Sequence, residues 1–394
     1  MKYCVLIIDG ASGLPLPERG GKTCLELAHT PNLDALSKEG VVGLARTVPV
    51  GMEPSSACAC MSVIGYDPRV HYKGRAAIEA RSMGINVGEG EVVFRCNLVA
   101  VRDGRMWDYS AGHIGTAEAG QLVAALNESL GSREVRFYPG ISYRHIVKLK
   151  GHEETLQATC TPPHDISNRQ IAEFLPHGEG SDFLLDLMAR SEAVLEDHVI
   201  NKERQARGEV PATRIWLFWG TGRLPDMPAF KQIYGVDAAM TSGVDLLHGL
   251  ALMAGMDVLE IAGVTDGPDN DYAGQIEGAL NTLDAHDLVV VHIEAPDEAA
   301  HAGSIEEKTE AIQQIDKEVV SRIRLFKDDA LRVLVMPDHP TTIQTRTHSP
   351  QPVPFLLWGP GFGGNGAGCF SEAEAKKTGF FMEDGYKIMD RLVK

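Results

Sequence analysis

The chain has 394 residues, of which 44% are hydrophobic and 23% are charged, a composition that excludes collagen-like and low-complexity disordered proteins. The 37 lysines and arginines face 54 aspartates and glutamates, which gives a formal net charge of −17. This field repels nucleic acids and anionic membranes, so neither is an expected partner, whereas a small anionic substrate remains compatible with a few local cations.

Short apolar strands alternate with helices over most of the chain. Residues 3–8 read as a buried strand, and Thr30 with Pro31 predicts the start of a helix that ends at Gly40. The repeated pattern predicts an α/β fold with a mostly parallel sheet flanked by helices. Further strands are expected at 41–47, 258–263, 287–293, 331–336 and 354–359, and further helices at 56–65, 271–283 and 305–326.

The middle of the chain has a different pattern. Between residues 86 and 177 the strands are shorter and alternate between apolar and polar positions, and turn signals stand at 103–104 and 139–140. We therefore expect a smaller α+β domain, residues 86–177, inserted into a discontinuous main domain made of residues 1–85 and 178–394.

Location in the cell is indicated by the cysteines and the apolar runs. The seven cysteines form no C-x-x-C pair, which favours reduced thiols over a disulfide framework. The opening MKYCVLIIDG lacks the features of a secretory signal, and apolar runs such as 288–291 are far shorter than the roughly 20 residues of a membrane helix. A cytoplasmic protein is expected, and assembly as a homo-oligomer is compatible with the sequence.

Three predicted strands run into an aspartate. Asp9, Asp297 and Asp338 follow the strands at 3–8, 287–293 and 331–336. The carboxyl ends of parallel strands line the ligand crevice of an open sheet, so these side chains are expected to meet there. Three adjacent carboxylates repel one another unless a cation lies between them. Capping of the following helix is the alternative explanation for any one of them.

Histidines accompany two of these aspartates. His301 lies one helical turn after Asp297, His339 directly follows Asp338, and His348 comes nine residues after His339. Carboxylate oxygens and imidazole nitrogens are ligands of divalent metal ions. Three aspartates with three histidines suffice for two ions, so the sequence predicts a dinuclear metal site.

A pair of serines stands where a helix is expected to begin. The N–H groups in the first turn of a helix favour an anion such as a phosphoryl group, and Ser55 and Ser56 occupy this position. A serine hydroxyl beside a metal ion has a lowered pKa and can act as a nucleophile. An ordinary N-cap serine is the alternative, and we interpret Cys58 and Cys60 as core thiols.

Long motifs resemble a known family. The segments at 20–40 (GGKTCLELAHTPNLDALSKEG), 62–85, 292–301 (HIEAPDEAAH) and 346–355 resemble archaeal-type 2,3-bisphosphoglycerate-independent phosphoglycerate mutases of the alkaline phosphatase superfamily. The resemblance implies interconversion of 3- and 2-phosphoglycerate through a phosphoserine, without 2,3-bisphosphoglycerate. It also implies two Mn²⁺, Zn²⁺ or Mg²⁺ ions, a small phosphorylated substrate, and an inserted domain that grips it.

Individual roles also follow from the resemblance. Ser56 is implied as the nucleophile. Asp297, His301 and His348 are implied as ligands of one ion, and Asp9, Ser56, Asp338 and His339 as ligands of the other.

The substrate carboxylate requires local donors in so acidic a chain, and arginine suits bidentate capture of carboxylates. Exposed surface ion pairing is the alternative explanation for each candidate. The candidates in and before the insert are Arg75, Arg95, Asn97, His113, Arg144 and His145.

Two features depart from the family pattern. Relatives usually carry Gly-Ser-Asp around the nucleophile, where this chain has Ser-Ser-Ala at 55–57. The segments at 108–113, 138–145 and 336–342 are more similar to a bacterial branch proposed to act as homoserine kinases. Phosphoryl transfer to homoserine on the same scaffold is therefore the alternative function.

Overall fold

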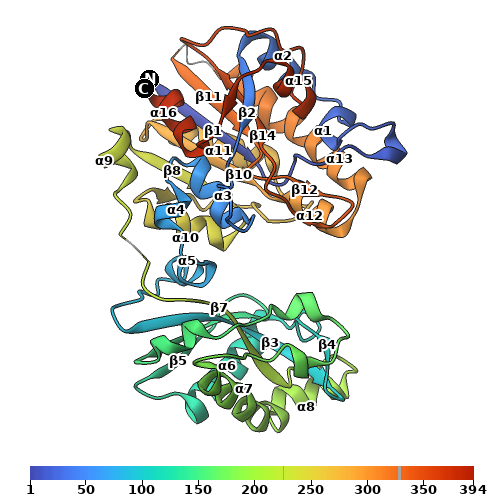
Figure 1. Ribbon diagram of the computed structural model, residues 1–394, viewed down its shortest axis with the longest axis vertical. Coiled ribbons are helices and arrows are strands. Elements are labelled where there is room, and N and C mark those ends of the chain that lie inside the picture. Colours follow the sequence, from blue (N-terminus) through green and yellow to red (C-terminus); the bar gives the residue numbers. More distant parts are fainter. Residues whose placement is uncertain (225, 327–329) are drawn as a thin grey trace. The chain divides into compact units, whose positions relative to one another are not determined.

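Strands rich in valine, isoleucine and leucine form the centre of the main body of the protein. The computed structural model describes residues 1–224, 226–326 and 330–394. The chain divides into two units, which are described separately: unit 1 comprises Met1–Tyr72 and Asp226–Lys394, and unit 2 comprises Lys73–Pro225 (Figure 1).

Unit 1 contains an eight-stranded sheet in the order β15-β2-β14-β11-β1-β10-β8-β9. Strand β1 pairs in parallel with both β10 and β11, while β14 runs antiparallel to β11 and β2. The predicted α/β fold with a mostly parallel sheet is therefore confirmed. The strands are β1 (Lys2–Ile8), β2 (Val41–Ala45), β8 (Ala238–Thr241), β9 (Asp257–Val258), β10 (Leu288–Ile293), β11 (Leu331–Met336), β14 (Val353–Trp358) and β15 (Phe381–Met382), with a separate hairpin of β12 (Thr341–Thr342) and β13 (Thr347–His348).

Helices cover this sheet. Alternate residues of β1 (Cys4, Leu6 and Ile8) are fully buried in a core that includes side chains of α2, α11 and α13. None of the described helices is long and apolar enough to span a bilayer. The helices of unit 1 are α1 (Cys24–Leu27), α2 (Pro31–Glu39), α3 (Ser56–Val63), α4 (Pro68–His71), α9 (Phe230–Tyr234), α10 (Asp245–Met253), α11 (Tyr272–Thr282), α12 (Ala295–Ala302), α13 (Ile305–Ile315), α14 (Ser321–Leu325), α15 (Glu372–Lys377) and α16 (Ile388–Val393).

Unit 2 is an α+β body larger than the predicted insert of residues 86–177. It extends beyond residue 177 because β7 pairs with β3 along most of its length, and it begins at Lys73 because alanines of α5 pack on Val93 of β3. Its elements are α5 (Arg75–Ser82), β3 (Glu91–Arg102), β4 (Arg105–Asp108), α6 (Thr116–Leu130), β5 (Val135–Tyr138), β6 (Arg144–Lys150), α7 (Ser181–Glu196), α8 (Val199–Ala206) and β7 (Arg214–Thr221).

Two predicted elements differ from those observed. The strand expected at 258–263 is reduced to the two residues of β9, which pair with the short β8. The helix expected at 305–326 is continuous in direction but contains a π-helical turn at Asp316–Val320 between α13 and α14.

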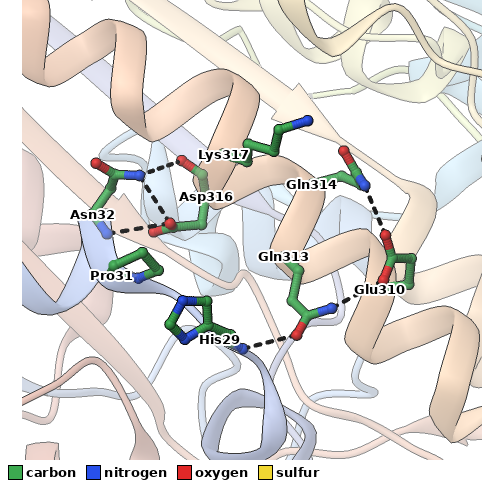
Figure 2. Close-up of a pocket in the computed structure, with 8 residues that line it drawn as sticks. All are labelled: His29, Pro31, Asn32, Glu310, Gln313, Gln314, Asp316 and Lys317. Carbon is green, nitrogen blue, oxygen red and sulfur yellow. Dashed lines mark hydrogen bonds between the residues drawn. The ribbon is translucent and has the colours of Figure 1, made fainter.

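Helix α2 begins at Pro31, as the sequence predicts, but Thr30 makes no side-chain capping bond. Asp316, 1% exposed, caps the helix instead. Its carboxylate accepts hydrogen bonds from the Leu33 N–H at 2.7 Å and from the Asn32 N–H at 3.2 Å. Figure 2 shows Asp316 and Asn32 on the wall of a surface pocket of about 320 Å³. A charge 283 residues away in the sequence thus satisfies orphan donors of α2.

Replacing Asp316 by alanine should lower the free energy of unfolding by about 2–3 kcal/mol, because buried N–H groups lose a charged acceptor. Urea unfolding followed by circular dichroism measures this change. The matched control is Glu310→Ala, an exposed residue on the rim of the same pocket, for which a change below about 0.5 kcal/mol is expected. Equal stability of the two variants would contradict the capping role.

Candidate metal centre

The strand order brings the three predicted aspartates together. Because β10, β1 and β11 are parallel neighbours, their carboxyl ends lie at one edge of the sheet (Figure 1). Asp9 follows β1, Asp297 lies in the first turn of α12 after β10, and Asp338 follows β11. All three side chains are buried. Burial and the charges of Asp338 and Asp297 raise the pKa of Asp9 well above its ordinary value.

Two histidine rings meet Asp297. Its Oδ2 lies 3.0 Å from His301 Nε2, one helical turn away, and its Oδ1 lies 3.6 Å from His348 Nε2. The two Nε2 atoms are 3.0 Å apart. Burial alone would raise the pKa of Asp297, but the hydrogen bonds from these histidines hold it well below its ordinary value. Burial opposes the charge on His301, yet the hydrogen bond to Asp297 raises its pKa to about 9.

A second group surrounds His339. The His339 Nε2 atom lies 3.2 Å from Asp338 Oδ2, 3.7 Å from Asp9 Oδ1 and 3.3 Å from Ser56 Oγ. Burial lowers the pKa of His339 to about 4, so the ring is neutral near pH 7, as a metal ligand must be. The structure thus brings all seven predicted ligand residues into two adjoining groups.

The three rings are turned inward by bonds on their outer nitrogens. In each histidine Nδ1 lies near an oxygen of the surrounding chain, which leaves Nε2 facing the other ligands. Such outer partners fix the orientation and tautomer of metal-binding histidines. The partners are the Arg346 carbonyl for His301 at 2.9 Å, the Pro54 carbonyl for His348 at 3.4 Å and the Thr341 hydroxyl for His339 at 3.2 Å.

These residues fit divalent metal ions. Bonds of about 2.0–2.2 Å to one ion place neighbouring ligand atoms roughly 3.0–3.6 Å apart, and the separations given above are 3.0–3.7 Å. In the described part of the chain, buried Asp9 Oδ1 has no hydrogen-bond partner. A buried carboxylate oxygen without a hydrogen-bond donor is costly to ionise, and a bound cation would offset this cost.

The two serines differ in what their hydroxyls contact. Ser55 is the N-cap of α3, and its Oγ accepts a hydrogen bond from the Cys58 N–H at 3.3 Å. Ser56 is the first residue of the helix, 8% exposed, with its Oγ near His339. The capping alternative left open by the sequence therefore describes Ser55, and the geometry at the metal centre belongs to Ser56.

Sequence reasoning missed three residues of the centre. His292 of β10 lies 2.7 Å from Asp9 Oδ2, and the Thr341 hydroxyl bonds to Asp297. Gly10 has φ +60° and donates its N–H to Asp338 Oδ1 at 3.2 Å, and a Cβ there would collide with Asp297. A histidine inside an otherwise apolar buried strand was the available signal for His292, because a buried ring needs a polar partner.

Unit 2 holds a separate cluster of arginines. Glu79 Oε1 on α5 accepts from Arg75 Nε at 2.6 Å and from Arg95 Nη1 at 3.1 Å. Burial opposes ionisation of Glu79, but the charges of Arg95 and Arg75 hold its pKa below its ordinary value. Arg144, paired with Asn97 across β6 and β3, adds a third cation whose charge acts on Glu79. Among the described residues, three guanidinium groups therefore act on the Glu79 carboxylate.

Aromatic rings hold the arginines in place. The Arg75 and Arg95 guanidinium carbons lie 5.1 Å and 5.5 Å from the Trp219 ring centroid. Trp219 has φ +51°, next to the shift in register between β3 and β7. Among the described residues, the buried Arg95 Nε and Asn97 Oδ1 atoms have no hydrogen-bond partner.

The two remaining candidates lie differently. His145 is 2% exposed, and its Nδ1 accepts the Gly140 N–H at 3.0 Å. Burial and then the charge of Arg95 lower the pKa of His145 to about 3. His113 lies on an exposed turn, with φ +50°, against the ring of Tyr143. His113 is therefore placed beside the residue that precedes Arg144, not in the arginine cluster itself.

Comparison with known proteins places the chain in a family. The family model described as 2,3-bisphosphoglycerate-independent phosphoglycerate mutase matches residues 37–201. A relative of that name from Methanothrix thermoacetophila is 46% identical over 396 residues, with 100% of both chains covered. Two solved structures are similar: one from Pyrococcus horikoshii, with a TM-score of 0.83, 26% identity and 99% and 96% of the chains covered, and a cofactor-independent phosphoglycerate mutase from Thermoplasma acidophilum, with a TM-score of 0.65, 25% identity and 100% and 99% covered.

The fold and the buried carboxylate–histidine centre are those of a metal-dependent α/β enzyme. The chain belongs to the family of 2,3-bisphosphoglycerate-independent phosphoglycerate mutases. The resemblance of the sequence motifs is confirmed, and these comparisons lend no support to the homoserine kinase alternative.

Stability of unit 2 should depend on pH through His145. The unfolded ring binds a proton below about pH 6.5, whereas burial in the folded state delays this until about pH 3. Between these values the unfolded state binds more protons, so stability falls as pH falls, by at most about 1.4 kcal/mol per pH unit. His145→Asn should remove that slope.

Urea unfolding at several pH values, followed by tryptophan fluorescence, measures the slope, since Trp107, Trp216 and Trp219 all lie in unit 2. The control is His177→Asn at an exposed position, which should keep the slope of the parent protein. An unchanged slope in His145→Asn would contradict the prediction, because it would show that His145 binds protons equally in the folded and unfolded states.

Proposed function

We propose that the protein interconverts 3-phosphoglycerate and 2-phosphoglycerate, with Ser56 as the residue that carries the phosphoryl group between the two positions. The observation that carries this proposal is the place of the Ser56 hydroxyl, 3.3 Å from His339 Nε2 beside a buried cluster of aspartates and histidines. The family membership of the chain supports the same activity. A substrate of glycolysis also supports the cytoplasmic location expected from the sequence.

The proposed cofactors are two divalent cations, with Mn²⁺, Zn²⁺ and Mg²⁺ as candidates. Asp297, His301 and His348 would hold one, and Asp9, Asp338, His339 and the Ser56 hydroxyl the other. When bound, such ions neutralise charge on the transferring phosphoryl group and lower the pKa of a neighbouring hydroxyl.

Ser56 acts twice in the proposed reaction. Its Oγ forms a bond to phosphorus while the bond between phosphorus and the C3 oxygen of the substrate breaks. The proton lost by Ser56 is balanced by the proton that the freed C3 oxygen gains. In the second half the C2 hydroxyl of the same glycerate takes the phosphoryl group, gives up a proton and restores Ser56, so no group is gained or lost overall. The position of Ser56 at the positive end of α3 favours the anionic phosphoryl group.

The arginine cluster of unit 2 is the proposed binding site for the substrate carboxylate. Arg75, Arg95 and Arg144 lie around Glu79, and Arg95 Nε, which has no hydrogen-bond partner among the described residues, offers a buried donor. A buried cation with an open donor is stabilised by a carboxylate, which accepts charge-assisted hydrogen bonds. Asn97 is proposed to bind a substrate hydroxyl through its partnerless Oδ1. His113 and His145 are proposed to border this site.

Ser56→Ala should abolish the conversion of 3-phosphoglycerate to 2-phosphoglycerate, because no other hydroxyl has the same contact with His339 in the described residues. The rate is measured by coupling 2-phosphoglycerate formation to enolase. Ser55→Ala is the matched control: it removes the N-cap of α3, which costs about 1 kcal/mol of stability, and it should keep the activity. Activity in Ser56→Ala with loss in Ser55→Ala would reverse the assignment.

Arg144→Gln should raise KM for 3-phosphoglycerate about 10- to 100-fold with a smaller effect on kcat, since a charge-assisted hydrogen bond to the substrate is lost. Arg144 is exposed, so the change leaves the core of unit 2 intact. Steady-state kinetics measure the effect. Arg136→Gln, an exposed arginine on the neighbouring β5, should keep the parent KM. Equal KM values in both variants would remove Arg144 from the proposed binding site.

A further inference from the structure

A buried polar chain links Asp9 to His292 and Ser242. His292 on β10 faces Asp9 on the end of the adjacent β1, and its side chain is completely buried. His292 Nε2 lies 2.7 Å from Asp9 Oδ2, and His292 Nδ1 lies 2.9 Å from the Ser242 hydroxyl. Ser242 follows β8, the strand on the other side of β10. Three adjacent parallel strands therefore contribute one residue each to this chain.

The direction of the hydrogen bonds follows from the partners. A carboxylate that binds a metal ion is ionised and can only accept, so in the loaded centre His292 Nε2 donates its proton to Asp9 Oδ2. In the neutral ring Nδ1 is then an acceptor, and the Ser242 hydroxyl is its donor. The Ser242 oxygen in turn accepts the Val244 N–H at 3.0 Å. Both ring nitrogens of His292 and the Ser242 hydroxyl have partners in this one arrangement.

The chain makes the two oxygens of Asp9 unequal. Oδ2 is occupied by His292, whereas buried Oδ1 has no hydrogen-bond partner among the described residues and lies 3.7 Å from His339 Nε2. Without the bond to His292, the carboxylate could rotate about its Cβ–Cγ bond and present either oxygen, or both, to the centre. Asp9 is thereby held with a single oxygen available.

We infer that His292 is a positioning residue that fixes Asp9 as a one-oxygen metal ligand, and that Ser242 fixes the tautomer with which His292 does so. This inference rests on the proposed metal centre. Cys60 and Asp9 also lie within reach of His292, so direct metal binding by the His292 ring is the competing role. The 2.7 Å contact favours positioning, because a nitrogen whose proton is donated to a carboxylate has no lone pair for a metal ion.

Calorimetric titration of the chelator-treated full chain with Mn²⁺ separates these roles without relying on activity. The parent protein should bind two ions. His292→Leu should still bind two, with one affinity weakened about 10- to 100-fold and the other little changed, as for loss of an outer hydrogen bond to a ligand. His292→Gln keeps a donor at similar reach and should recover most of the loss. Ser242 contacts His292 and not the predicted metal ligands, so Ser242→Ala should weaken the same affinity by only a few fold.

The outcomes distinguish the inference from the proposal beneath it. A parent protein that binds no Mn²⁺ contradicts the proposed metal centre itself. If the parent binds two ions but His292→Leu and His292→Gln each bind only one, His292 is itself a ligand and the positioning role is overturned. The positioning role is also overturned if His292→Leu, His292→Gln and Ser242→Ala all bind both ions with the affinities of the parent protein. His286→Gln, a histidine in the loop before β10 that pairs with Asp257, is the control and should keep both affinities.

Discussion

Mutual repulsion of buried carboxylates is the constraint on which the rest of unit 1 depends. Three parallel strands deliver Asp9, Asp297 and Asp338 to one edge of the sheet, where burial strengthens their repulsion. Such a site is stable only with compensating positive charge. Three features are those expected of ligands of metal cations. The histidine Nε2 atoms face inward, hydrogen bonds hold their outer nitrogens, and Asp9 Oδ1 has no hydrogen-bond partner among the described residues. The buried Lys308 ammonium group donates hydrogen bonds to the Ser12 and Thr341 carbonyl oxygens at 2.9 and 2.7 Å. These bonds connect the loops that follow β1 and β11.

Unit 2 presents the opposite electrostatic problem. In a chain with a net charge of −17, the charges of Arg75, Arg95 and Arg144 all act on the Glu79 carboxylate. The Trp219 ring lies close to the guanidinium groups of Arg75 and of the buried Arg95. Burial makes an open donor such as Arg95 Nε expensive to leave unpaired, so the cluster favours an anion. The carboxylate cluster of unit 1 and the arginine cluster of unit 2 therefore favour ligands of opposite charge.

The alternatives left open by the sequence are separated by contacts, not by residue type. Ser55 and Ser56 are identical side chains at adjacent positions, and only the N-cap bond to Cys58 and the contact with His339 tell them apart. The same holds for α2: Thr30 has the residue type of a cap, but Asp316 provides the capping oxygens. The capping propensity of a residue type describes only local interactions. A stronger acceptor from a distant part of the sequence can take over the capping role.

Features whose causes lie within a few residues can be predicted from the amino-acid sequence. Apolar runs defined the central strands, and the helical spacing of Asp297 and His301 was enough to place both on one face, 3.0 Å apart. Tertiary structure alone decided that β1 lies between β10 and β11, that His292 meets Asp9 across 283 residues, and that α5 and β7 belong to unit 2. Local spacing fixes local geometry because bond lengths and helix pitch do so, whereas strand order and long-range pairs depend on how whole surfaces pack, which no short stretch of residues encodes.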